Sequence, residues 1–218
     1  MYLKKRLGCL HAHYSNIEYI EHTFQNNEDI ELIHFVDPGV MQQISKGMDN
    51  LTRKVREQIE WIASCDVDAI LITCTNYIAL LQDDAAFDSS IPIIKIDEPY
   101  FESICNVQQP ITILFTNPLT VEGTMARLHQ YAKHHEKSVT VVAKVIEQTF
   151  DLLMQGKKRA YSDVILQTLL SLTDEERLIS VAQLSMVEAA QQFEEQTAIS
   201  VIHPVKPLVA VVKKSLGI

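Results

Sequence analysis

The chain has 218 residues, of which 47% are hydrophobic and 22% charged, so it can bury a substantial core and is not a disordered chain. Its formal net charge of −9 argues against a nucleic-acid partner, because proteins that bind phosphate backbones present a basic face. No apolar run reaches the roughly 18 residues of a membrane span, and the apolar stretch near the N-terminus is too short for a signal peptide, so we expect a cytoplasmic protein without a membrane partner.

Strand-like and helix-like segments alternate through the first half of the chain. Short apolar runs predict strands at residues 2–10, 30–36, 69–73 and 92–96. Helices are predicted at residues 16–25, 50–64 and 77–81, with Ser15 as the cap of the first. The Asp37-Pro38-Gly39 segment predicts a turn after the second strand.

A second series of the same kind follows. Strands are predicted at residues 111–115, 139–145, 178–182 and 199–202, with a turn at 116–120. Helices are predicted at residues 98–105, 121–134, 148–155, 162–172, 186–195 and 205–216. This alternation is typical of the α/β class, in which parallel strands are joined by right-handed crossovers.

The two series predict two α/β halves, residues 1–97 with 204–218 and residues 98–203. Open parallel sheets bind ligands at the carboxyl ends of their strands. Short polar segments follow four of the predicted strands, at residues 11–15, 73–77, 116–120 and 183–186. Each precedes a helix, and helix N-termini offer N–H groups that suit a carboxylate or phosphate. We therefore expect a pocket for a small anion, formed between the halves.

The cysteines and histidines do not form a familiar metal motif. Cys9, Cys65, Cys74 and Cys105 include no CxxC pair, which argues against a zinc ribbon or a redox dithiol. His11 and His13 have the spacing of one strand face, but no carboxylate cluster lies nearby in sequence, so we expect no metal. There is no GxGxxG or GxxxxGK[ST] sequence to indicate nucleotide binding.

Several of these segments together resemble the aspartate/glutamate/hydantoin racemase superfamily over nearly the whole chain. They are Gly8 with His11, residues 36–37, residues 73–76, residues 116–118 with Thr120, and residues 182–186. Cys74 and the Ser185-Met186 pair are the most specific parts. The resemblance implies two flavodoxin-like parallel-sheet halves related by a pseudo-two-fold axis, with the active site in the cleft between them. It also implies catalysis without a cofactor and is consistent with a homodimer.

The resemblance assigns the chemistry to cysteine. In that superfamily two thiols face each other across the substrate, one removing the α-proton and the other returning a proton to the opposite face. Cys74 matches the first thiol, while the position of the second falls in residues 183–186, where Ser185 is the closest candidate. A hydroxyl has too high a pKa to replace a thiol in this exchange, so the chain resembles a divergent member with a single catalytic cysteine.

The expected site therefore has two catalytic residues and six that bind the ligand. Cys74 and Ser185 are the catalytic candidates, and the binding candidates are His11, Thr75, Asn76, Thr116, Thr120 and Met186. Backbone N–H and hydroxyl groups of these residues would hold a carboxylate and stabilise a carbanion next to it.

The expected function is that of a cofactor-independent racemase or isomerase acting on a small carboxylate, such as an amino acid or dicarboxylate. Three alternatives stay open. A single cysteine is also enough for a decarboxylase or lyase, as in the related arylmalonate decarboxylases. The chain is alternatively a non-catalytic carboxylate-binding protein. A cysteine hydrolase with His11 as base would form a covalent adduct on Cys74.

Overall fold

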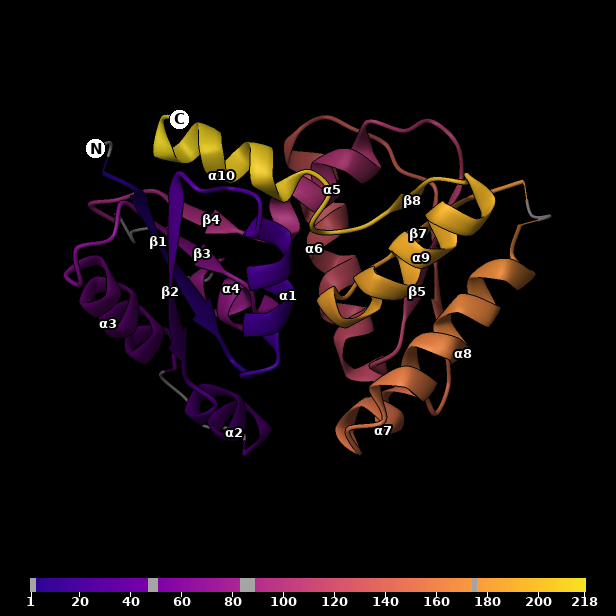
Figure 1. Cartoon of the computed structure of the whole chain (residues 1–218), viewed down its shortest axis with the longest axis horizontal. Coiled ribbons are helices and arrows are strands. Elements are labelled where there is room, and N and C mark those ends of the chain that lie inside the picture. The colour runs from indigo at the N-terminus through magenta and orange to yellow at the C-terminus, as the bar shows by residue number, and fades with distance from the viewer. Residues whose placement is uncertain (1–2, 47–50, 83–88, 174–175) are drawn as a thin grey trace. The chain divides into compact units, whose positions relative to one another are not determined.

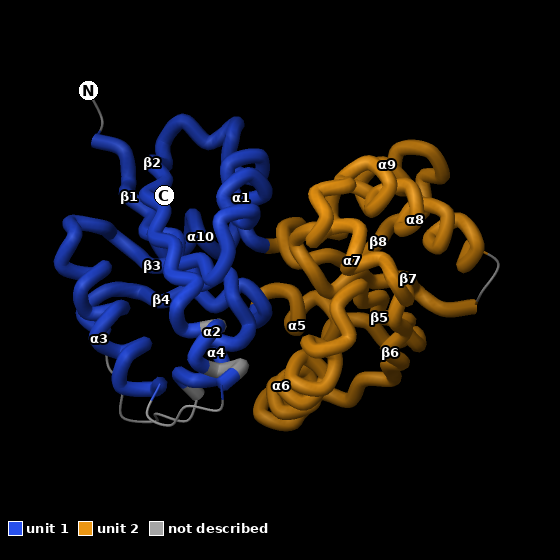
Figure 2. The backbone as a smooth tube through the Cα atoms, turned by 90° about the horizontal axis from the view of Figure 1, so that it is seen from below, with its two compact units in different colours: residues 1–98, 208–218 blue, residues 99–207 orange. Residues whose placement is uncertain are grey.

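The computed structural model of the chain describes residues 3–46, 51–82, 89–173 and 176–218, which form two α/β units (Figure 1). Unit 1 comprises Met1–Glu98 with Leu208–Ile218, and unit 2 comprises Pro99–Pro207 (Figure 2). The α/β class predicted from the sequence is confirmed. Tyr2 and Asn50, at which two of the predicted elements begin, lie outside the described residues. In the described ranges, no helix has the length and apolar character needed to cross a membrane.

Unit 1 is built on a four-stranded parallel sheet with the order β2-β1-β3-β4. Its strands are β1 (Lys5–His11), β2 (Ile30–Val36), β3 (Ala69–Ile72) and β4 (Ile93–Lys95). All four residues of β3 are buried. Burial of both faces explains why this strand is an uninterrupted apolar run in the sequence rather than an alternating one.

Unit 1 has five helices in the part of the chain that the structure describes. They are α1 (Asn16–Phe24), α2 (Gly39–Ser45), α3 (Leu51–Ala63), α4 (Thr75–Gln82) and α10 (Leu208–Leu216). The buried face of α3 is the predicted one, with Leu51, Val55, Ile59 and Ile62. Gly8 on β1 allows the close approach of this helix, because a Cβ atom at Gly8 would lie 3.1 Å from Ile62 Cγ2.

One helix of unit 1 was not predicted and one predicted cap is absent. Residues 37–39 end β2 at Val36 as predicted, but Asp37 Oδ1 accepts a hydrogen bond from Gly39 N at 2.7 Å and helix α2 begins at that glycine. The Ser15 side chain makes no capping hydrogen bond to α1. Its hydroxyl lies 2.8 Å from His13 Nδ1 instead, so a local side-chain contact replaces the cap.

Unit 2 repeats the same strand arrangement, with the order β6-β5-β7-β8 and all strands parallel. Its strands are β5 (Ile111–Phe115), β6 (Val141–Val145), β7 (Leu178–Val181) and β8 (Val201–Ile202). Its α-helices are α5 (Asp97–Cys105), which begins in unit 1, α6 (Val121–His134), α7 (Thr149–Met154), α8 (Lys158–Ser171) and α9 (Val187–Thr197). Two short 3₁₀ helices follow strands, η1 (Pro118–Thr120) and η2 (Leu184–Met186).

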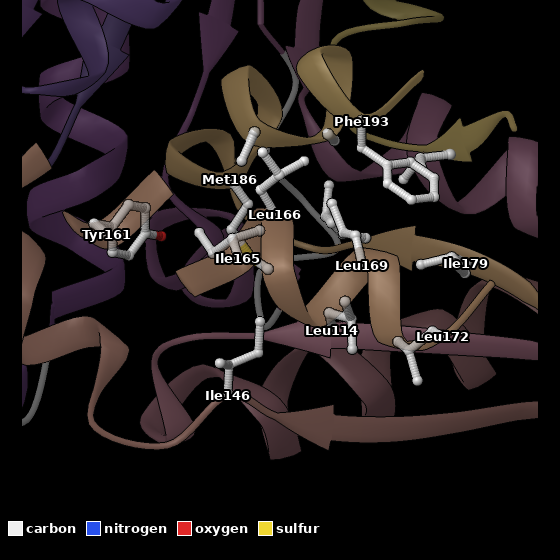
Figure 3. Packing of buried hydrophobic residues seen from close by; sticks show 14 residues of the cluster. Leu114, Ile146, Tyr161, Ile165, Leu166, Leu169, Leu172, Ile179, Met186 and Phe193 are labelled. Atoms are coloured by element: carbon white, nitrogen blue, oxygen red, sulfur yellow. The ribbon is translucent and has the colours of Figure 1, made fainter. Parts of the chain in front are cut away.

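The core of unit 2 lies on both faces of its sheet. On one face, α8 and α9 contribute Leu169 and Phe193 to a cluster that also contains Leu114 of β5 (Figure 3). The neighbouring strand residues Ile113 and Phe115 belong to a second cluster, because successive residues of a strand point to opposite faces. Burying a side chain such as Phe193 contributes about 1.5–3 kcal/mol, so the two clusters stabilise the sheet from both faces.

Candidate functional site

The expected site residues of unit 1 lie at the carboxyl ends of its two central strands. Leu10 of β1 pairs with Ile72 of β3, and Thr73 N donates to Leu10 O at 3.1 Å. This pairing brings His11 and Thr73 together, with the His11 Nδ1 atom 2.8 Å from Thr73 Oγ1. Cys74 therefore follows the end of a central strand, as the sequence predicted.

Cys74 connects β3 to helix α4. Its carbonyl accepts a hydrogen bond from Ile78 N at 3.1 Å, and the helix begins at the next residue, Thr75. Cys74, Thr75 and Asn76 are all half-buried, between the core and solvent. The N–H groups of a first helical turn attract negative charge, so this is a place where a thiolate or a bound carboxylate is stabilised. The four cysteines are not in disulfides.

The His11 side chain belongs to a chain of hydrogen bonds that crosses the sheet. Beyond Thr73, His11 Nε2 lies 2.8 Å from His34 Nδ1, and His34 Nε2 lies 3.0 Å from Glu21 Oε1. Burial, followed by the neighbouring His34, lowers the pKa of His11 to about 4. His11 is therefore neutral at pH 7, and both of its ring nitrogens contact protein groups.

A second set of contacts holds the end of β2 against this site. Asp37 N donates to His11 O at 2.9 Å, and the Tyr77 hydroxyl of α4 donates to Asp37 O at 3.0 Å. Burial raises the pKa of Tyr77, with smaller contributions from the charges of Asp37 and Cys74. The neutral phenol therefore acts as a hydrogen-bond donor that connects the start of α4 to the loop after β2.

In unit 2, the equivalent strand ends are joined by the side chain of Gln183. Its Oε1 atom accepts three hydrogen bonds, from Thr116 N at 2.7 Å, Thr116 Oγ1 at 2.8 Å and Asn117 N at 3.2 Å. Two of the donors are backbone N–H groups, so the atom that they contact must be the amide oxygen. The half-buried Gln183 side chain thus has a fixed orientation, in which Nε2 is its remaining arm with two N–H donors.

The directions of the neighbouring hydrogen bonds follow from this arrangement. The Thr116 hydroxyl has one proton, which it donates to Gln183, so Thr116 Oγ1 accepts from the Tyr161 hydroxyl 3.0 Å away. The proton of Tyr161 is then committed, and its oxygen accepts from Ser185 Oγ at 2.6 Å. Ser185 therefore presents lone pairs rather than its proton to any further partner.

The other expected donors of unit 2 also donate to protein acceptors. Thr120 Oγ1 donates to Asn117 O at 2.9 Å, and Met186 N donates to Gln183 O at 3.0 Å. The Met186 side chain is fully buried and packs in the cluster of α8 and α9 (Figure 3). The anion-binding donors expected from the Met186 N–H and from the Thr116, Thr120 and Ser185 hydroxyls are thus engaged within unit 2.

Strand pairing also identifies the residue of unit 2 that is equivalent to Cys74. Ala182 N donates to Leu114 O, as Thr73 N donates to Leu10 O in the same strand order. Ala182 is therefore the topological counterpart of Thr73, and Gln183 is the counterpart of Cys74. The resemblance indicated Ser185, two residues further on, because the sequence alone does not show which strand ends are paired.

Three residues with well-defined contacts were not among the expected ones. Gln183 was detectable, since it directly follows the predicted strand 178–182, as Cys74 directly follows the predicted strand 69–73. Tyr161 lies on α8 and His34 on β2, and no local sequence pattern connects either of them to its partners.

Comparisons with known proteins bear on the fold. No protein-family model matches the sequence, and no curated protein matches it. Among solved structures, the chain is similar to aspartate racemase of Picrophilus torridus, with a TM-score of 0.75 and 14% identity over 98% of this chain and 94% of that one. It is also similar to allantoin racemase of Klebsiella pneumoniae, with a TM-score of 0.70 and 19% identity over 98% and 88%.

A third similar structure is glutamate racemase RacE1 of Bacillus anthracis, with a TM-score of 0.65 and 11% identity over 98% of this chain and 83% of that one. All three comparisons cover nearly the whole chain, and each is with a protein named as a racemase. The fold expected from the sequence resemblance is confirmed: this chain has the fold of the aspartate, glutamate and allantoin racemases.

Proposed function

We propose that this chain is an isomerase-type enzyme that acts on the carbon acid of a small carboxylate, with Cys74 as the acid/base group. The observation that carries the proposal is the position of Cys74, half-buried between the end of the central strand β3 and the first residue of α4. The racemase fold supports the same assignment by analogy.

The proposed reaction needs a thiolate and a place for negative charge. Cys74 as thiolate would take the proton next to the carboxylate, becoming a thiol, while the electron pair of the broken C–H bond moves toward the carboxylate oxygens. Return of a proton from the thiol to the same face, after exchange of the thiol proton with solvent, restores the carboxylate with a solvent hydrogen, whereas inversion would need water to deliver the proton to the opposite face. Fixed donors that are already oriented toward the developing charge stabilise such an intermediate more than water does. We assign the N–H groups of Thr75 and Asn76 to this role in unit 1.

We also assign Gln183 Nε2 as a carboxylate donor of unit 2. Its amide oxygen accepts three hydrogen bonds, which hold the Nε2 group in one orientation. The Gln183 side chain therefore loses no further rotamer freedom when a ligand binds. An amide donates hydrogen bonds but does not exchange protons as a thiol does. Ser185 would then accept a hydrogen bond from the ligand, because its own proton goes to Tyr161.

Gln183 also favours a second function, that of a decarboxylase or lyase. Because Gln183 is the counterpart of Cys74, two-thiol exchange has no second thiol at that position. A decarboxylase or lyase needs only one, since loss of carbon dioxide generates the carbanion and Cys74 then protonates it. A non-catalytic carboxylate-binding protein needs none.

Isotope exchange separates these possibilities. The protein is incubated in deuterated water with a panel of amino acids, dicarboxylic acids and malonates, and the products are followed by NMR. Deuterium at the α-carbon with carbon retained supports the isomerase, and loss of carbon dioxide supports the decarboxylase. Thermal stabilisation by a carboxylate without either reaction supports the binder.

Three variants test the residues. Cys74→Ala should reduce exchange to the uncatalysed rate, while the control Cys65→Ala, at another half-buried cysteine, should leave it unchanged. Gln183→Leu should weaken carboxylate binding and lower the rate together. Exchange that persists in Cys74→Ala would overturn the proposal, and a covalent adduct on Cys74 would indicate the hydrolase instead.

A further inference from the structure

Three potential metal ligands meet on one face of the unit 1 sheet, at a place that the proposed reaction does not use as an acid/base site. Cys9 and His11 are two residues apart on β1 and point to the same side of the sheet. Cys9 pairs with His34 of β2, which adds the third side chain to that side. One ligand atom from each of the three residues lies within 4.8 Å of the other two.

The outer nitrogens of both imidazoles are held by other groups. His11 Nδ1 lies 2.8 Å from Thr73 Oγ1, and His34 Nε2 lies 3.0 Å from Glu21 Oε1. In metal sites, a histidine ligand typically donates its second ring N–H to a carboxylate, hydroxyl or carbonyl oxygen, which fixes the ring and its tautomer. His11 and His34 have this arrangement, and their inner nitrogens, Nε2 and Nδ1, face each other 2.8 Å apart.

Two ring nitrogens 2.8 Å apart cannot both present lone pairs to each other, so either a hydrogen atom or a metal ion lies between them. In one state this is a proton, with His11 Nε2–H donating to His34 Nδ1 and the Thr73 hydroxyl donating to His11 Nδ1. In the other state a metal ion takes the place of this proton. Both inner nitrogens then present lone pairs to the metal ion, and His11 Nδ1–H donates to Thr73. The Thr73 hydroxyl can then donate to Leu10 O, 3.2 Å away. All of these polar groups are satisfied in both states.

We propose that Cys9, His11 and His34 form a binding site for a borderline-soft divalent cation of the zinc type, independent of the proposed function. A thiolate with two neutral imidazoles is a typical donor set for zinc, and hard cations such as magnesium prefer oxygen ligands. Binding converts the Cys9 thiol to a thiolate and releases one proton, while His11 changes tautomer and His34 keeps its tautomer. One exogenous ligand completes a tetrahedron.

The surroundings explain the difference between the two states. Burial raises the pKa of Cys9, so the thiol is neutral without a metal ion. His34 is the most accessible member, with a side-chain exposure of 14%, and it lies next to the more exposed Glu21. The His13 side chain, which the sequence paired with His11, is exposed and contacts Ser15 instead.

Titration with cobalt(II) and zinc(II) alone tests the site. Cobalt(II) should bind to the metal-free protein with one equivalent per chain, release about one proton and show a sulfur-to-metal charge-transfer band, and zinc(II) should then displace it without further proton release. Zinc(II) should also raise the melting temperature. The Cys9→Ser variant should lose the charge-transfer band, and His34→Gln should weaken binding at least tenfold.

Matched controls distinguish this site from surface histidines. Cys105→Ser changes another buried cysteine and should keep both the band and the affinity, as should His13→Gln. His34 is partly exposed, whereas Cys9 is fully buried. The His34→Gln variant therefore still tests the site if Cys9→Ser does not fold. Binding that is equal in Cys9→Ser, His34→Gln and the controls would overturn the proposal, as would the absence of any binding, which would leave only the proton-bridged histidine pair.

Discussion

Acid should destabilise unit 2 through His203, which follows β8 and is 3% exposed. Burial lowers the pKa of His203 to about 4 from its ordinary value of 6.5. The nearby Glu194 carboxylate raises this pKa, with its Oε2 atom 4.0 Å from His203 Nε2, and Lys206 lowers it, so the cost of burial outweighs the attraction. Since the folded state binds the proton more weakly than the unfolded state does, stability is lost as the pH falls from 6.5 toward 4.

The magnitude follows from the two pKa values. A lowering from 6.5 to about 4 corresponds to about 3 kcal/mol of unfolding free energy once both forms are titrated, and to about 2 kcal/mol at pH 5. In His203→Leu this dependence should disappear. The free energy of unfolding of the wild type, relative to that of the variant, should therefore fall by about 2 kcal/mol between pH 8 and pH 5.

Urea unfolding followed by far-ultraviolet circular dichroism measures this difference at pH 8, 6.5 and 5. Other groups, including His11, titrate equally in both proteins and cancel in the comparison. Glu194 stays ionised across this range, because its pKa is below its ordinary value. His13→Leu, at an exposed histidine, is the control and should follow the wild type. A difference between wild type and His203→Leu that is constant from pH 8 to pH 5 would refute the reasoning.

Two further substitutions test packing and hydrogen bonding. Gly8→Ala places a Cβ atom 3.1 Å from Ile62 Cγ2 and should lower the free energy of unfolding by about 1–3 kcal/mol in thermal unfolding. The control Gly123→Ala, whose Cβ atom meets nothing closer than 3.7 Å, should cause no such loss. Equal effects of the two substitutions would contradict the crowding argument. Tyr161→Phe removes the hydroxyl that joins Thr116 to Ser185 and should cost about 1–3 kcal/mol in urea unfolding. A cost below about 0.5 kcal/mol would indicate that water replaces that hydroxyl.

The alternation of elements was readable from the sequence because it depends on local patterns. Buried parallel strands are short continuous apolar runs, such as β3, and α3 repeats its apolar residues at helical spacing. The strands β2 and β5 were predicted with the bounds that they have. Helix α2 was missed, because Asp37-Pro38-Gly39 is a turn signal that here becomes the start of a helix.

The position of Cys74 after a central strand was likewise predictable, since it required only the end of one apolar run and the start of one helix. The sequence also narrowed its counterpart to residues 183–186. It did not select Gln183 over Ser185, because that choice depends on which backbone groups pair between β5 and β7. This pairing joins distant parts of the chain: the hydrogen bond from Thr116 to Gln183 connects residues that are 67 positions apart.

Local periodicity thus determined the kind and order of the elements, because helices and strands are formed by neighbouring residues with a fixed repeat. Only the tertiary structure decided the partners of the polar side chains. The pairing of β1 with β2 brings Cys9, His11 and His34 together, and the hydrogen bonds around Gln183 commit the donors of Thr116 and Ser185. Such contacts join residues that are distant in sequence, and each depends on strand register, which a single sequence does not specify.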